Sequence, residues 1–239
     1  MVPGARVVRA DLLASSLQIA PLLLGARLVH DDGSGRVAVR LTEVEAYTGQ
    51  SDPASHAYRG PTPRTQVMFG PPGHLYVYFS YGMHWCANVV CGPEGEAFAV
   101  LLRGGEVVEG LAAARARRPA ARDDAELARG PARLTTTLGL GREHDGADLC
   151  AGDARVWLEP APEGLADARG AVCTGPRVGV AGPGGDADVY PWRFWLAGEP
   201  SVSVYRPGKP RRRPAVAGGR LSGTRSGGEA ARDERTATP

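Results

Sequence analysis

Hydrophobic and polar positions alternate along the first part of the chain, and this period of two indicates strands. Residues 36–47 read RVAVRLTEVEAY, the run ARLVH comes shortly before them, and the turn residues DDGSG stand between the two runs. This order predicts a β-hairpin. Upstream of it, residues 12–24 predict a short helix that is kinked or restarted at Pro21 and stops at Gly25.

The alternation returns after residues 48–73, which are rich in Gly, Pro, Ser and Thr. A loop of this length inside a compact domain is usually functional. Three strand-like runs then follow with a Gly at or near the end of each, and their spacing predicts an antiparallel meander. These runs are residues 74–82, 84–92 and 97–104.

The second half of the chain predicts two helical segments, residues 105–118 and 123–139, the second broken around Gly130. Four short strands are predicted after them, at residues 155–159, 177–181, 193–197 and 201–205. No Gly-rich phosphate loop leads into a helix, so no Rossmann core is expected. The pattern predicts an α+β domain around a curled antiparallel sheet with flanking helices.

Composition divides the chain after residue 205. Residues 1–205 are expected to form one domain, whereas residues 206–239 are dominated by Pro, Gly, Arg, Ser and Thr and predict a disordered tail. The tail holds nine Arg or Lys and three Asp or Glu, a charge of +6, which leaves −4 on the domain. The tail's charge can add non-specific affinity for DNA. Binding of phosphates by the domain itself would need a local patch of Arg.

Lysine and cysteine usage excludes some chemistry. Lys209 is the only lysine and lies in the tail, so the domain offers no amine for a Schiff base. The four cysteines form no CxxC pair and are interpreted as reduced thiols of a cytoplasmic protein. His84, Cys86 and Cys91 lack a second ligand pair at a zinc-like spacing, so no metal is expected.

No targeting or membrane segment is expected. The apolar run near the N-terminus is interrupted by polar residues and by Pro21, which disfavours an export signal. No stretch of about 20 apolar residues predicts a membrane span.

Two carboxylates are the first candidates for chemistry. Strand alternation places Glu43, Glu45 and Tyr47 on one face of the strand at residues 36–47. Residues two apart on a strand have Cα atoms about 6.6 Å apart, so one carboxylate can act as a base while the other supports it. The same pattern also fits the solvated face of an edge strand, and the sequence leaves both interpretations open.

Aromatic residues gather in the stretch LYVYFSYGMHWCAN, residues 75–88, which holds five of the fifteen in the chain. Alternation puts Tyr76 and Tyr78 on one face of a strand, while Val77, Phe79 and Trp85 are predicted to pack in the core. Nothing in the pattern assigns Tyr76 a role.

The turn that follows offers a second aromatic feature. Gly82 favours a tight turn that would leave Tyr81 projecting at its tip. Tyrosines on a pocket face and at a tip suit a protein that unstacks and holds a nucleobase, because stacking is worth about 1–3 kcal/mol per base.

Several motifs in one order resemble the alkyladenine (3-methyladenine) DNA glycosylase family. They are TEVEAYTG, SHAYRGPTPRT, MFGPPGHLYVYFSYGMHWCANVV and AVLLRGGEVVEG, and the likeness extends over residues 10–205. The resemblance implies one α+β domain, similar to the C-terminal domain of formyltransferases. It also implies a monofunctional hydrolase of base excision repair with no lyase activity and no cofactor.

The resemblance implies a substrate class as well. The partner would be double-stranded DNA, bound by a monomer without a membrane, in the cytoplasm at the nucleoid. The lesions would be alkylated or deaminated purines: 3-methyladenine, with 7-methylguanine, hypoxanthine and ethenoadenine as further candidates.

Roles within the site are also carried by the resemblance. Glu45 would be the general base that activates the attacking water, and Tyr47 and Tyr78 would stack on the flipped base, with His56 hydrogen-bonded to it. Tyr81 would fill the gap left in the duplex. Two further pocket residues are implied: Asn88, which would clash with the exocyclic amine of undamaged guanine, and Arg103 near the site.

Contacts with the DNA backbone are predicted from exposed or loop arginines. They are Arg59, Arg64, Arg133 and Arg177, together with Arg103. His84 and Trp85 stand where the family often has other aromatic residues. This difference is expected to alter how the region around Tyr81, the residue that would fill the gap, packs against the strand, and it leaves the range of lesions open.

Two other functions remain open from the sequence. A non-catalytic binder of damaged DNA would keep the tyrosines but would not need Glu45. A carbohydrate-active glycoside hydrolase would use Glu43 and Glu45 as its two acids, although such acids usually face each other across a cleft.

Overall fold

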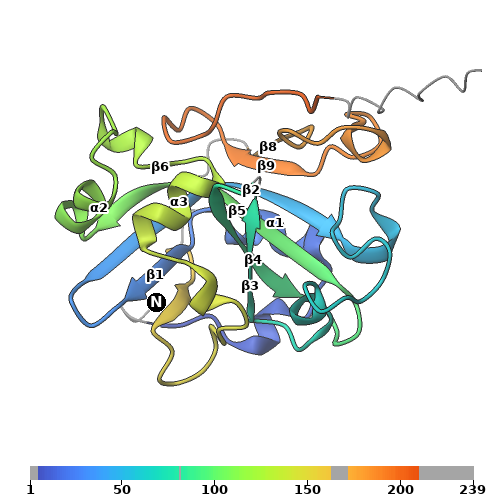
Figure 1. The fold of residues 1–239 in the computed structure, drawn as a ribbon, viewed down its shortest axis with the longest axis horizontal. Coiled ribbons are helices and arrows are strands. Elements are labelled where there is room, and N and C mark those ends of the chain that lie inside the picture. Colours follow the sequence, from blue (N-terminus) through green and yellow to red (C-terminus); the bar gives the residue numbers. More distant parts are fainter. Residues whose placement is uncertain (1–4, 81, 163–171, 210–239) are drawn as a thin grey trace, which may run out of the picture.

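The computed structural model describes residues 5–80, 82–162 and 172–209, and its centre is one large sheet (Figure 1). The strand order is β3-β4-β5-β2-β1-β7, with β6 paired to β5, β9 paired to β2 and β8 paired to β9. Every strand pair is antiparallel, which confirms an α+β domain built on an antiparallel sheet. The strands are β1 Arg27–Asp31, β2 Arg36–Thr48, β3 Leu75–Ser80, β4 His84–Cys91, β5 Phe98–Glu109, β6 Ala128–Arg129, β7 Val156–Glu159, β8 Val172–Gly175 and β9 Arg193–Leu196.

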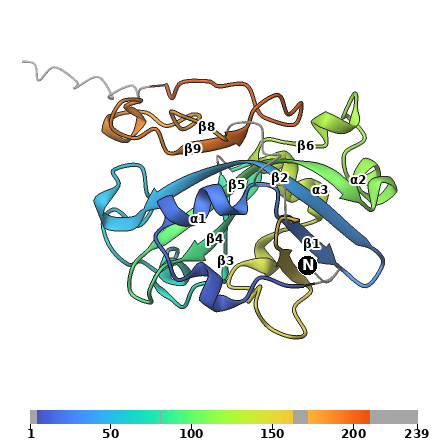
Figure 2. The same cartoon turned by 180° about the vertical axis from the view of Figure 1, so that it is seen from behind.

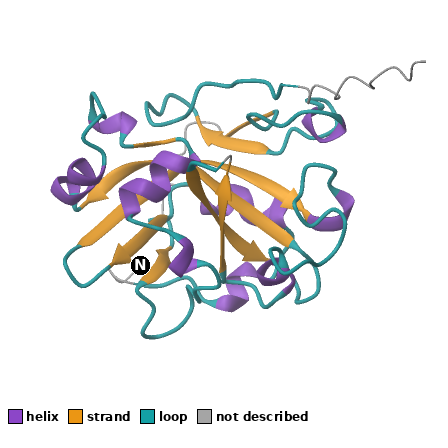
Figure 3. Cartoon of the chain, in the orientation of Figure 1, coloured by secondary structure: helices purple, strands orange, loops and turns teal. Residues whose placement is uncertain are grey.

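The helices are short and lie around this sheet (Figure 3). In Figure 1 α3 lies nearer the viewer than α1, and in the reverse view of Figure 2 α1 lies nearer the viewer than α3. The α-helices are α1 Ser16–Leu23, α2 Leu111–Arg117 and α3 Pro131–Leu138. The 3-10 helices are η1 Arg9–Leu12, η2 Gly49–Ser51, η3 Gln66–Phe69, η4 Asp124–Glu126, η5 Arg142–His144 and η6 Pro183–Gly185.

The hairpin of β1 and β2 forms as the alternation predicts. Its turn is held locally, because the Oδ1 of Asp32 accepts hydrogen bonds from the backbone N of Ser34 at 2.8 Å and of Gly35 at 3.2 Å. The second half of β2 is central, since Glu43–Glu45 pair with β5 on one side and with β9 on the other. Both carboxylates have 0% exposed surface, so the interpretation as a solvated edge strand is wrong.

Two apolar clusters hold the domain together. The larger one joins α1 and α3 to the sheet and includes Ile19, Val44 and Leu134. A smaller one lies between the loop after β2 and the strands β3, β4 and β5, and it includes Met68 and Tyr76. The smaller cluster supports one side of the site described below.

The structure corrects several predicted elements. Residues 105–109 continue β5 instead of starting a helix, because their β-branched residues pair with β2, and α2 begins only after Gly110, whose φ of 74° breaks the strand. Residues 177–181 form a turn and residues 201–205 are irregular, so neither is a strand. Phe79 is 46% exposed, and its ring contacts Trp85 in a tilted arrangement with the centroids 4.8 Å apart, so its assignment to the core is wrong.

The end of the described chain packs on the domain. Residues 206–209 belong to the predicted tail, yet Gly179 N donates a 2.8 Å hydrogen bond to Arg206 O. The remaining tail, residues 210–239, lies outside the described residues, so its predicted disorder stays a prediction. In the described part of the chain, no helix combines the length and apolar character needed to cross a membrane.

Candidate functional site

A pocket opens between the loop after β2 and the strands β3 and β4. The empty space within it, including the part open to solvent, is about 330 Å³. Three of the predicted base-binding residues, Tyr47, His56 and Tyr78, line it together with Asn88. The structure therefore brings together side chains that come from residues 47–88 of the sequence and from three separate elements.

The tyrosine face predicted for β3 forms one wall of the pocket. The rings of Tyr76 and Tyr78 stack with centroids 5.4 Å apart, and His56 meets the edge of Tyr78 at 4.6 Å. His56 Nδ1 lies 3.1 Å from the Oη of Tyr76. His56 as a residue is exposed, but the side chains packed around its ring desolvate it, and this, with a smaller contribution from the charge of Arg64, lowers its pKa to about 4, so the imidazole is neutral near pH 7.

A larger groove leads into this pocket, and the two share Tyr47, His56 and Tyr78 as lining residues. Glu45 and Arg103 also line the groove. Glu45 is thus the carboxylate of the groove, and its hydrogen-bond partner Tyr47 lines both the groove and the pocket.

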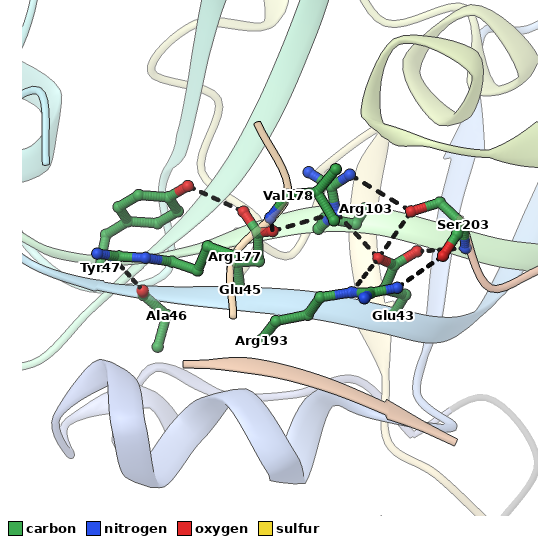
Figure 4. Close-up of polar contacts among 9 residues, drawn as sticks. All are labelled: Glu43, Glu45, Ala46, Tyr47, Arg103, Arg177, Val178, Arg193 and Ser203. Atoms are coloured by element: carbon green, nitrogen blue, oxygen red, sulfur yellow. Dashed lines mark hydrogen bonds and ion pairs between the residues drawn. The ribbon is translucent and has the colours of Figure 1, made fainter. Parts of the chain in front are cut away.

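Three groups hold Glu45 in place (Figure 4). The hydroxyl of Tyr47 donates to its Oε2 at 2.9 Å, and the backbone N of Val178 donates to its Oε1 at 2.7 Å. The Nε of Arg103 lies 3.4 Å from Oε1. A carboxylate offers about four lone-pair positions, so Oε2 keeps room for one more donor, such as a water.

Glu43 is held differently, although it shares the strand and the burial of Glu45. Its Oε1 accepts from Arg103 Nε at 3.0 Å, from Arg193 Nε at 2.7 Å and from Ser203 Oγ at 2.8 Å. Its Oε2 accepts from the backbone N of Ser203 at 2.7 Å. Four donors thus hold the carboxylate, three of them on Oε1, and Glu43, unlike Glu45, does not line the groove.

Arg103 links the two carboxylates, as Figure 4 shows. Burial opposes its charge, but the neighbouring Glu45 and Glu43 raise its pKa further, so it remains a cation. The predicted place of Arg103 near the site agrees with this geometry. Burial, and then the charge of Glu45, raise the pKa of Tyr47 well above its usual value, so its hydroxyl keeps the proton that it donates.

The prediction that Arg177 contacts the DNA backbone is wrong. The side chains of Arg177 and Asp52 are both 0% exposed and form a two-pronged ion pair. The two terminal nitrogens of Arg177 donate to the two carboxylate oxygens of Asp52 at 2.5 Å and 2.8 Å. Arg177 donates as well to Ala46 O at 3.0 Å and to Gly184 O at 2.8 Å. Its guanidinium carbon lies 4.5 Å from the ring centroid of Tyr47, behind the pocket wall.

The other predicted backbone contacts have varied positions. Arg64 is exposed, lines the groove and lies 5.3 Å from the ring centroid of Tyr78. Arg59 is exposed on the same loop, and Arg133 is half-buried on α3. Their contacts with DNA stay predictions.

Asn88 and Tyr81 are the remaining predicted residues of the pocket and the wedge. Asn88 is 4% exposed, lines the pocket and donates from Nδ2 to the backbone O of Tyr76 at 3.1 Å. Tyr81, the predicted wedge, lies outside the described residues. Its neighbours Ser80 and Met83 are joined by a backbone hydrogen bond of 3.1 Å across the connection between β3 and β4.

Sequence reasoning missed several residues of the site. Tyr76 contacts His56 through its hydroxyl, Val178 holds Glu45 through its backbone, and Asp52 clamps Arg177. The alternation of RVGVA misled the prediction for residues 177–181, since it favoured a strand where the chain turns toward Glu45. Within the ranges that the structure describes, no group of three or more His, Cys, Asp or Glu could hold a metal ion.

Comparison with known proteins agrees with the resemblance seen in the motifs. The sequence profile described as Methylpurine-DNA glycosylase (MPG) matches residues 10–200. Among the most similar curated proteins are three that each carry the name "Putative 3-methyladenine DNA glycosylase".

The three relatives come from different bacteria. The protein of Leifsonia xyli subsp. xyli is 56% identical over 203 residues, which is 83% of this chain and 92% of the relative. That of Streptomyces avermitilis is 56% identical over 199 residues, 82% of this chain and 90% of the relative. That of Burkholderia cenocepacia is 47% identical over 201 residues, which is 84% of this chain and 92% of the relative. The chain belongs to the methylpurine-DNA glycosylase family.

Proposed function

We propose that this protein is a monofunctional DNA glycosylase of base excision repair, which flips a damaged purine out of duplex DNA and hydrolyses its N-glycosidic bond. It acts as a monomer and uses Glu45 to activate the attacking water. The observation that carries the proposal is the position of Glu45: a buried carboxylate with one free acceptor site lines the groove and is bonded to Tyr47, which also lines the pocket walled by tyrosines.

The flipped base occupies the pocket in this proposal. Tyr47 and Tyr78 stack on it, and His56 provides a hydrogen bond at the edge. Asn88 is already fixed by its bond to the β3 backbone, so its amide is a rigid feature against which an added exocyclic amine would clash. Stacking of about 1–3 kcal/mol per base offsets much of the cost of unpairing. Tyr81 is proposed as the wedge that fills the vacated space in the duplex.

Hydrolysis then needs one base and one departing group. The water oxygen forms a bond to C1′ of the sugar and Glu45, the general base, takes the proton of the water. The damaged nucleobase leaves with the electron pair of the glycosidic bond. The reacting sugar has oxocarbenium character, which the Glu45 carboxylate also stabilises. Arg103 and Val178 hold Glu45 from the side opposite the free position, so the carboxylate does not need to reorganise during the reaction.

Glu43 is assigned a supporting role. It accepts from four donors, two of them arginines, and it does not line the groove in which the water would approach. It fixes Arg103, which in turn contacts Glu45. This division also disfavours the two-acid arrangement of a glycoside hydrolase, because the carboxylates lie along one strand and only one of them lines the groove.

The chemistry of departure suggests a preference among lesions. An alkylated purine such as 3-methyladenine carries a positive charge and leaves without an acid, whereas a neutral base such as hypoxanthine needs a proton. His56 is the titratable imidazole of the pocket, and its pKa of about 4 makes it a weak source of protons at pH 7. We therefore expect alkylated purines to be released faster than deaminated ones.

The test is a panel of duplexes that each contain one lesion and are otherwise identical. Single-turnover release should be fastest for 3-methyladenine, followed by 7-methylguanine, and slower for hypoxanthine and ethenoadenine, with no strand cleavage before alkaline treatment. Tight lesion binding without release by folded protein would instead indicate a non-catalytic damage binder. Strand cleavage without alkali would contradict the monofunctional assignment.

A further inference from the structure

Two carboxylates and two arginines form one buried cluster around the proposed general base. Glu43 and Glu45 of β2 carry the negative charges, and Arg103 of β5 and Arg193 of β9 carry the positive ones (Figure 4). All four residues are at most 6% exposed. Because a buried charge needs a partner nearby, the division of the two cations between the two carboxylates decides how each carboxylate behaves.

Arg103 is shared between the two carboxylates. Its Nε lies 3.0 Å from Oε1 of Glu43 and 3.4 Å from Oε1 of Glu45. Arg193 differs from it, because within the described part of the chain its one carboxylate partner is Glu43, whose Oε1 accepts from the Nε of Arg193 at 2.7 Å. Arg193 thus supplies the second positive charge to the carboxylate that does not line the groove.

Ser203, in the segment after β9, holds this arrangement together. It donates to Glu43 from its backbone N at 2.7 Å and from its Oγ at 2.8 Å. Its backbone O accepts from Nη2 of Arg193 at 2.6 Å, and its Oγ accepts from Nη2 of Arg103 at 3.4 Å. Ser203 therefore contacts three of the four charged residues, while neither it nor Arg193 lines the groove.

We propose that Arg193 and Ser203 are positioning residues for the general base: they neutralise and fix Glu43, so that the charge of Arg103 stays available to keep Glu45 ionised. The inference rests on the proposed function, because it takes Glu45 as the base. Without Arg193, two carboxylates would share a single arginine, and like charges close together disfavour the ionised form. Glu45 would then take up a proton at a higher pH and could no longer accept one from the water.

Several other groups face Glu45, and substitutions of Arg193 or Ser203 leave them in place. They are the hydroxyl of Tyr47 on β2, the backbone N of Val178 beyond β8 and, within electrostatic range, Tyr78 on β3, Cys86 on β4 and Arg177. A change in the pH dependence of such variants therefore reports on the cluster of four charges.

Charge-balanced substitutions in the full chain test the proposal. Arg193→Gln leaves two carboxylates with Arg103 alone, and the double variant Arg193→Gln with Glu43→Gln restores the balance. The readout is the pH dependence of single-turnover release from a 3-methyladenine duplex, and circular dichroism identifies the folded variants. The acidic limb of the profile should move upward by about 1 pH unit in Arg193→Gln and should return toward the wild-type position in the double variant. An unshifted limb in Arg193→Gln, or a double variant shifted as far as Arg193→Gln, would overturn the role of Arg193.

A matched pair of serines tests the proposal in variants that keep every charge, and it stays decisive if Arg193→Gln does not fold. Ser203→Ala removes the hydroxyl that contacts Glu43 and Arg103. Ser201→Ala removes a hydroxyl of the same segment that is bonded to Thr42 instead, at 2.9 Å. Release at pH 7 should fall about 3- to 10-fold in Ser203→Ala, because the lost hydrogen bond to a charged group acts on the base through Arg103, and less than about 2-fold in Ser201→Ala. Equal effects of the two variants would overturn the role of Ser203.

Unfolding measurements keep this inference apart from the proposed function, because they need no DNA. In folded Arg193→Gln the unbalanced carboxylate binds a proton more readily than in the unfolded chain. The loss of unfolding free energy relative to the wild type should therefore shrink as the pH falls from 7 to 5. If the wild type releases bases but the variants show neither pH effect, the positioning role is wrong and the function stands. If unfolding shows the expected pH dependence but the wild type releases no base, the division of charge stands, and its catalytic role fails together with the enzymatic function.

Discussion

Replacing Asp52 with Asn is expected to lower the free energy of unfolding by about 3–5 kcal/mol, because it leaves the buried Arg177 without its counter-charge. Both side chains are 0% exposed, and the pair is joined by two hydrogen bonds. The backbone oxygens of Ala46 and Gly184 still accept from Arg177, but they carry no charge. A loss of this size is a large part of the roughly 5–15 kcal/mol that stabilises a typical domain.

A matched control isolates the contribution of burial. Asp124 makes the same two-pronged contact with Arg115, at 2.9 Å on both oxygens, but the side chains are 50% and 61% exposed. Asp124→Asn should therefore cost only about 0.2–1 kcal/mol. Arg177 donates through both Nη atoms and Arg115 through Nε and one Nη, but both pairs are two-pronged, so the main difference between the two variants is the burial of the pair.

Equilibrium unfolding in urea, followed by circular dichroism and tryptophan fluorescence, measures both losses. Trp192 is a suitable reporter, because its ring centroid lies 5.2 Å from the guanidinium carbon of Arg177. Adding Arg177→Met to Asp52→Asn should recover part of the loss, since it removes the unpaired charge. A loss below about 1 kcal/mol in Asp52→Asn, or one equal to that of Asp124→Asn, would refute the reasoning.

Three further predictions concern the site itself. Tyr47→Phe keeps the stacking ring but removes the hydrogen bond to the Glu45 carboxylate, and a hydrogen bond to a charged group is worth about 1.5–3 kcal/mol. Single-turnover release should therefore fall about 10- to 100-fold while lesion binding persists. An unchanged rate would show that the hydroxyl does not act on Glu45. Tyr81→Ala should weaken capture of the flipped base, read by a fluorescent base analogue, more than the chemical step, and the reverse pattern would contradict the wedge role. In the unfolded chain His56 takes up a proton near pH 6.5, whereas in the folded protein it does so only near pH 4, so the free energy of unfolding should fall as the pH drops between these values. The His56→Gln variant should lose less stability over this pH range, which thermal melts from pH 7 to 4 can check.

The local pattern of the sequence predicts much of the first half of the fold. The hairpin of β1 and β2 and the strands β3 and β4 follow from alternation and turn residues, which act over a few positions. The same alternation places Glu43, Glu45 and Tyr47 on one face, and the structure confirms that the last two are in contact. The local pattern therefore pointed to these residues but left their role open, and the roles proposed for them came from the family resemblance.

Distant contacts decide what the local pattern leaves open. Glu43 and Glu45 look equivalent in the sequence, and they differ because Val178 binds one of them while Arg193 and Ser203 bind the other, from 133 to 160 positions away. Arg177 looks like a surface arginine until its partner Asp52, 125 positions away, is known. No window of neighbouring residues contains this information, so the prediction for Arg177 was wrong.

The central claim is that Glu45, and not Glu43, activates the water, and a comparison of Glu45→Gln with Glu43→Gln tests it most directly. Both changes keep the shape of the side chain and remove its charge. Single-turnover release from a 3-methyladenine duplex, beside lesion binding and circular dichroism, separates chemistry from folding. We expect Glu45→Gln to lower release by at least about 10²-fold while lesion binding persists, and folded Glu43→Gln to keep substantial release. Release retained by Glu45→Gln but lost in folded Glu43→Gln would contradict this claim and would reassign the base to Glu43.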